Sequence, residues 1–161
     1  MKKSLVSFLS AALLLSSASS VALAEQSTVS PQGLITPQAI GADSGWQTKN
    51  NIRARVYTDA TSYGPGTKNV NVTVEKSTVG AADYIIDVEK QESNGNWVGA
   101  GSAQIHGTIA NSASHSIPIS SLLSVNTQGT FRIQLRIFQY ANPDGYLGTW
   151  YTSSFTVVRT N

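Results

Sequence analysis

The sequence contains no cysteine among its 161 residues. A scaffold held together by disulfides is therefore excluded, and so is attachment to a membrane through a lipid-bearing cysteine. A chain of this length without disulfides has to be stabilised by its own hydrophobic core.

Residues that commonly carry catalysis are scarce. There are only two histidines, His106 and His115, and no serine stands in a G-x-S-x-G motif. Metal-binding spacings for zinc or calcium are absent, as are glycine motifs that hold phosphate. Asp83, Asp87 and Glu89 share one side of a predicted strand, and a solvated face explains them more simply than acid–base chemistry. We therefore expect no enzyme and no metal or other cofactor.

An excess of either charge is also lacking. The sequence has eleven basic and nine acidic residues, and Lys2 and Lys3 lie in an N-terminal leader, so the processed chain is neutral. A general electrostatic case for nucleic-acid binding therefore fails.

The first residues have the organisation of a secretory signal peptide. Lys2 and Lys3 precede an apolar stretch over 5–15, and Ala22-Leu23-Ala24 provides a cleavage site. The apolar stretch is too short for a permanent membrane span. We predict a signal peptide over 1–24 and a secreted, extracellular protein, free or associated with the cell wall, with no membrane insertion after processing.

The processed chain divides into two parts. Residues 25–45 are polar and contain two prolines without periodicity, which predicts a flexible N-terminal arm or pro-segment. Residues 46–161 read as successive strands and suit a single domain.

Period-two alternation predicts seven short strands in the domain. They favour a seven-stranded antiparallel β-sandwich of immunoglobulin-like type, with a small β-barrel as the alternative. The cysteine–tryptophan–cysteine signature of true immunoglobulin domains is absent, so the resemblance concerns architecture alone.

Asn94-Gly95 predicts a two-residue type I′ hairpin turn between two of these strands. This turn fixes the register of the hairpin. Tyr84 should lie opposite Ile105, Ile86 opposite Ala103, and Val88 opposite Gly101.

The last hairpin contains six of the chain's aromatic residues, between Phe138 and Phe155. Asn142-Pro143-Asp144-Gly145 predicts a three-residue loop closed by a glycine bulge. In that register Leu135 faces Ser153, and Tyr151 and Phe155 point into the core.

The same register predicts an aromatic and arginine surface on the opposite face of the hairpin. Its candidate ligand-binding residues are Arg132, Arg136, Phe138, Tyr140, Tyr146 and Trp150. Flat rings flanked by guanidinium groups suit stacking on sugars or docking of a protein. Two simpler interpretations are cross-strand pairing of the rings and coverage by the N-terminal arm through Leu34, Ile35 or Ile40.

These features favour a monomeric, non-catalytic extracellular binding module, whose partner is a cell-envelope glycan or another extracellular protein. One alternative is a secreted antagonist, meaning an inhibitor, toxin or immunity-type protein, acting through a loop such as Ser62–Lys68. The other is a structural surface protein that assembles through sheet edges or exposed aromatic rings.

Overall fold

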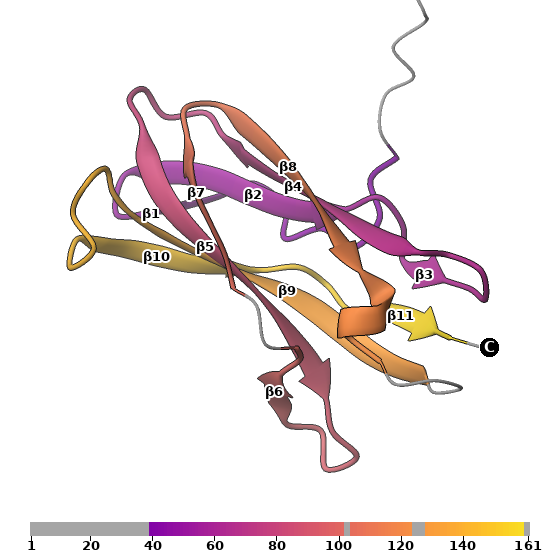
Figure 1. The fold of residues 1–161 in the computed structure, drawn as a ribbon. Coiled ribbons are helices and arrows are strands. Elements are labelled where there is room, and N and C mark those ends of the chain that lie inside the picture. Colours follow the sequence, from indigo (N-terminus) through magenta and orange to yellow (C-terminus); the bar gives the residue numbers. More distant parts are fainter. Residues whose placement is uncertain (1–38, 102–103, 124–127, 160–161) are drawn as a thin grey trace, which may run out of the picture. The chain divides into compact units, whose positions relative to one another are not determined.

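The computed structural model describes residues 39–101, 104–123 and 128–159, which belong to one compact unit (Figure 1). The predicted signal peptide and residues 25–38 of the predicted arm lie outside the described residues. The strands are β1 (Gln47–Lys49), β2 (Ile52–Thr58), β3 (Ser62–Tyr63), β4 (Asn69–Lys76), β5 (Ala82–Gln91), β6 (Trp97–Gly99), β7 (Ile105–Ile109), β8 (Ser112–Pro118), β9 (Gln128–Gln139), β10 (Tyr146–Tyr151) and β11 (Phe155–Val158). A short 3-10 helix, η1 (Ile119–Ser121), follows β8.

The strands form two sheets, which lie one over the other in Figure 1. The first has the order β1-β2-β4-β8. The second has the order β3-β11-β9-β5-β6, with β10 also paired to β9 and β7 also paired to β5. All pairings are antiparallel except that of β11 with β3. The predicted all-β sandwich is confirmed.

The core lies between the inward faces of the two sheets. Alternate residues of the central strands are fully buried, as half-buried strands require. From β4 these are Val70, Val72 and Val74, and from β9 they are Phe131, Ile133, Leu135 and Ile137. The period-two pattern of both strands was therefore predicted correctly.

More strands are present than the seven predicted. The described residues contain eleven because β1 and β3 are too short to show alternation, and two predicted strands are interrupted. The interruptions fall after Gly99, between β6 and β7, and at 152–154, between β10 and β11.

The predicted turn at Asn94-Gly95 is wrong in type. Glu92 N donates to Asn96 O at 2.8 Å, which leaves a three-residue loop over 93–95. Gly95 has φ of 87° while Asn94 is not among the residues with positive φ. A type I′ turn needs positive φ at both central residues, and that condition is met instead by Asn50 and Asn51 between β1 and β2, with φ of 44° and 64°.

The register of this hairpin therefore differs from the prediction. Tyr84 lies opposite Gly107, and Ile86 lies opposite Ile105. Ala103 lies outside the described residues. The small residue opposite Tyr84 is required, because a Cβ at Gly107 would stand 2.4 Å from the Tyr84 hydroxyl oxygen.

The register of the last hairpin was also predicted wrongly. The turn at 142–145 exists, but Gln139 N donates to Gly145 O at 2.8 Å, so the loop spans five residues, 140–144. Ala141 takes φ of 54° in this loop, and a bulge follows between Tyr146 and Gly148. Leu135 therefore faces Trp150 instead of Ser153. This odd shift exchanges the inward and outward faces of β10.

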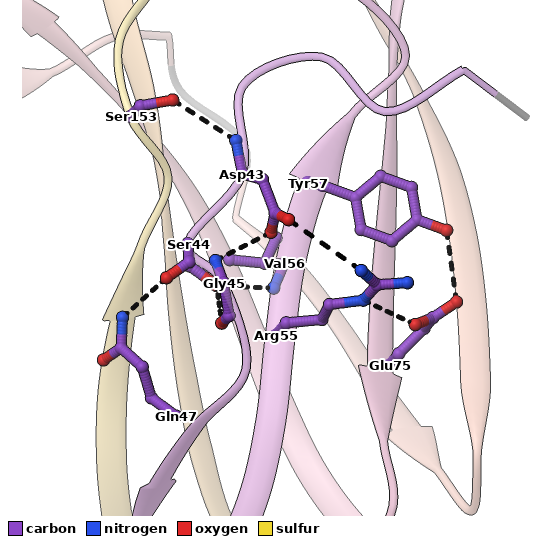
Figure 2. A network of polar contacts seen from close by, with 9 residues as sticks. All are labelled: Asp43, Ser44, Gly45, Gln47, Arg55, Val56, Tyr57, Glu75 and Ser153. Atoms are coloured by element: carbon purple, nitrogen blue, oxygen red, sulfur yellow. Dashed lines mark hydrogen bonds and ion pairs between the residues drawn. The ribbon is translucent and has the colours of Figure 1, made fainter.

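Residues 41–45 belong to the sandwich, so the predicted domain boundary at residue 46 is wrong. Gly41 N donates to Thr58 O at 2.7 Å, and Thr58 N donates to Ala42 O at 2.9 Å. Ala42 is fully buried. Figure 2 shows the next residue, Asp43, whose backbone N donates a hydrogen bond to Ser153 Oγ at 3.3 Å. Of the three arm residues expected to cover the aromatic surface, Ile40 is 52% exposed, and Leu34 and Ile35 lie outside the described residues.

Buried tyrosines give the fold an expected sensitivity to alkaline pH. Burial raises the pKa of Tyr57, Tyr63 and Tyr84. Above about pH 10 an unfolded tyrosine loses its proton while these keep theirs, so stability present below pH 10 should be lost as pH rises. Burial lowers the pKa of Lys76, so Lys76 makes stability rise with pH. The three tyrosines outnumber it, and we expect a net loss of stability.

In Tyr63→Phe the free energy of unfolding should fall less steeply with pH. The difference from the native protein amounts to a factor of up to about ten in the folding equilibrium constant for each pH unit. Urea unfolding between pH 8 and pH 11 would measure the slope, with the exposed Tyr140→Phe as the matched control. Parallel slopes for the native protein and Tyr63→Phe would contradict the expectation.

Candidate functional site

The solvent-facing side of the seven-stranded sheet, here called the outer sheet face, brings together four strands. Residues paired across antiparallel strands share a face, so the register defines rows across β7, β5, β9 and β10. Starting from the end beside the 140–144 loop, the rows are Thr108, Asp83, Phe138 and Tyr146; His106, Ile85, Arg136 and Thr149; Asp87, Gln134 and Tyr151; and Glu89 with Arg132.

Arg132 lies between two aromatic rings on this face. Its Cζ is 4.4 Å from the centroid of the Trp97 ring and 4.2 Å from that of Tyr151. Its Nε donates to Glu89 Oε2 at 2.6 Å, and the Tyr151 hydroxyl accepts a hydrogen bond from Gln134 Nε2 at 3.0 Å. We call these five residues the arginine–aromatic cluster. Cation–π contacts and the ion pair together hold the rings in fixed orientations.

The charges of the outer sheet face largely compensate one another. Arg136 donates to Asp87 Oδ2 at 2.7 Å, as Arg132 does to Glu89. Asp83 has no cationic partner within ion-pair distance in the part of the chain that the structure describes. The face therefore carries no excess of positive charge, and a polyanion is a poor partner for it.

A pocket of about 510 Å³ opens at the loop end of the outer sheet face. It forms because the 140–144 loop folds back onto β5, where Ala141 N donates to Asp83 Oδ2 at 2.8 Å. The other oxygen of Asp83 accepts a hydrogen bond from Thr108 Oγ1 at 2.6 Å. The ring of Phe138 lines the pocket and contacts Tyr146 edge to face, with centroids 5.8 Å apart.

Five of the six predicted site residues are accessible in this region. Arg132, Arg136 and Phe138 lie half-buried on the outer sheet face. Tyr146 on β10 is 53% exposed, and Tyr140 in the loop is 62% exposed.

The placement of Trp150 on this surface is wrong, and so is that of Tyr151 in the core. Trp150 is 0% exposed, and its Nε1 donates to Gln47 O of β1 at 3.2 Å. Tyr151 is 39% exposed and belongs to the arginine–aromatic cluster. Phe155 is buried as predicted.

Sequence reasoning missed Trp97, His106 and Thr108, which come from other strands and are placed beside the last hairpin by the pairing of β6 and β7 with β5. A glycine inside a strand pattern often marks a bulge. Gly148 lies inside such a pattern. A bulge at Gly148 predicts that Trp150 points into the core and that Tyr151 points to solvent.

The four-stranded sheet carries a similar cluster on its own outer face (Figure 2). Arg55 Cζ lies 5.1 Å from the Trp46 ring centroid and 4.8 Å from that of Tyr57. Glu75 accepts hydrogen bonds from Arg55 Nε at 2.7 Å and from the Tyr57 hydroxyl at 3.2 Å. Arg55 also lies 3.8 Å from Asp43. These contacts attach residues 43–46 to the sandwich, which is a structural role.

Within residues 39–101, 104–123 and 128–159, no three histidine or acidic side chains are grouped as a metal site would require. The same residues include no helix long and apolar enough to span a membrane.

In a comparison with known families, residues 39–158 match the family described as YqgA MG2 macroglobulin domain. The match covers most of the chain and includes residues 41–45, which pack onto the sandwich. Macroglobulin domains of this type are immunoglobulin-like, in agreement with the predicted architecture. No curated protein matches the chain.

Proposed function

The chain belongs to the family of YqgA MG2 macroglobulin domains, and from this premise we propose that it is a secreted, non-catalytic binding module. Its outer sheet face would hold a cell-envelope glycan or another extracellular protein. The proposal joins an immunoglobulin-like module to the signal peptide expected from the sequence.

The observation that carries this proposal is the arginine–aromatic cluster. Trp97, Arg132 and Tyr151 come from three different strands and are already stacked. Side chains fixed before binding lose little further conformational freedom when a partner arrives. Tryptophan, tyrosine and arginine are also the residues that most often dominate binding energies at interfaces.

The two alternative functions have less support. The antagonist hypothesis placed a reactive loop at Ser62–Lys68, but Ser62 and Tyr63 form β3 and pair with β11. Tyr63 is 3% exposed. The self-assembly hypothesis relied on sheet edges or exposed aromatic rings, and the rings of the arginine–aromatic cluster are engaged with Arg132.

Trp97→Ala and Tyr151→Ala should each weaken binding by about 30-fold, the effect of losing a residue that contributes 2 kcal/mol at an interface. The processed chain would be incubated with purified cell wall and with secreted proteins, and the bound fraction measured.

Trp46→Ala is a matched control, because Trp46 stacks on arginines of the four-stranded sheet instead. Its binding should equal that of the native protein. If Trp97→Ala and Tyr151→Ala bind as well as Trp46→Ala does, the outer sheet face is not the binding site.

A further inference from the structure

We propose that the pocket at the loop end of the outer sheet face binds one ring of an uncharged, hydroxyl-bearing sugar. This assignment rests on the proposed binding function and specifies the ligand at one part of the same face.

The size of the pocket is that of a small-ligand site, large enough for one sugar ring. Its volume of about 510 Å³ lies in the range of small-ligand sites, roughly 300–1,000 Å³. The hydrogen bond from Ala141 N to Asp83 holds the loop wall in place. The chain's own hydrogen bond therefore fixes this wall of the pocket.

The pocket lining has apolar and polar parts. Ile85, Phe138 and Pro143 are its apolar components, and Asp83, His106 and Thr108 are its polar ones. A sugar ring has the same division, because its C–H groups can stack on an aromatic ring while its hydroxyls form hydrogen bonds.

The polar groups retain capacity for ligand hydroxyls. The Asp83 carboxylate accepts one hydrogen bond at each oxygen from its own chain, whereas a carboxylate can accept about four. His106 is exposed, and either of its ring nitrogens can take part in hydrogen bonding. Hydroxyl groups, which both donate and accept, match this set.

The charges around the pocket favour a neutral occupant over an anion. The Asp83 carboxylate repels an anion. Arg136, which lies opposite Ile85 in the adjacent row, is ion-paired with Asp87 and does not offset this repulsion. An uncharged ring is not repelled by Asp83.

The test is a titration of the processed, isotope-labelled chain with glucose, N-acetylglucosamine and its neutral tetramer, followed by NMR chemical shifts. Saturable shifts are expected at pocket residues. His106→Ala and Phe138→Ala should each weaken the affinity by about tenfold, a typical effect of leaving one binding contact unmade. Ser112→Ala, an exposed change on the four-stranded sheet, should bind like the native protein.

The sugar assignment is overturned if none of the three sugars produces saturable shifts. It is also overturned if both pocket variants bind the sugars as the native protein does, or if lysine-containing peptides or inorganic phosphate occupy the pocket instead. The proposed binding function is judged separately, by whether wall or protein capture still depends on Trp97 and Tyr151. Loss of the sugar result alone leaves that function standing.

Discussion

Trp150→Ala is expected to destabilise the domain by about 3–5 kcal/mol, the usual cost of truncating a buried tryptophan or phenylalanine to alanine. The side chain is 0% exposed, and its indole nitrogen donates to Gln47 O. Truncation would leave a cavity in the core and remove a hydrogen bond that joins β10 of one sheet to β1 of the other. Small domains have only about 5–15 kcal/mol of stability, so the urea midpoint should fall sharply.

Tyr151→Ala is the matched control for this prediction. The two residues are adjacent, and they differ in which side of β10 they occupy. Because Tyr151 is 39% exposed, its truncation should change the free energy of unfolding by no more than about 1 kcal/mol. If Tyr151→Ala lowers the free energy of unfolding more than Trp150→Ala does, then Tyr151 and not Trp150 points into the core.

The second large effect is expected for Asp59→Ala, at about 2–4 kcal/mol of stability lost, because hydrogen bonds to a charged group are strong and their buried partners would be left unsatisfied. Asp59 Oδ1 accepts from the Tyr63 hydroxyl at 2.5 Å and from Asn71 N at 3.1 Å. Its Oδ2 accepts from Asn71 Nδ2 at 2.7 Å. The carboxylate thus connects the end of β2 with both sheets, through β3 and β4.

Urea and thermal unfolding would measure this loss. Asp59→Asn should be less damaging than Asp59→Ala, because one amide oxygen can still accept. Asp144→Ala, in the exposed part of the 140–144 loop, serves as the control and should leave the midpoint unchanged. Equal midpoints for Asp59→Ala and Asp144→Ala would contradict a structural role for the Asp59 hydrogen bonds.

The alternation of single strands was readable from the sequence, whereas pairing between strands was not. Phe131 to Ile137 show which face of β9 is buried without reference to any neighbour. Pairing depends on loop length, and Asn142–Gly145 is compatible with loops of three or five residues. The five-residue loop is formed because Ala141 adopts positive φ, a conformation that an alanine does not signal.

The same distinction explains how much of the candidate site could be foreseen. Arg132, Arg136 and Phe138 lie on β9, where alternation alone assigned the face correctly. Trp97 joins them only through the pairing of β5 with both β6 and β9. The alternation of a single strand does not show which other strands lie beside it, so the contact of Trp97 with Arg132 could not be predicted from β9 alone.

The three tryptophans are distributed so that each reports on a different part of the molecule. Trp150 lies in the core, Trp97 in the arginine–aromatic cluster, and Trp46 on the four-stranded sheet. Intrinsic fluorescence therefore contains three spectroscopic signals. In a variant that lacks Trp46, the fluorescence of Trp150 would report on unfolding, and that of Trp97 would report on binding at the outer sheet face. No extrinsic dye would be needed.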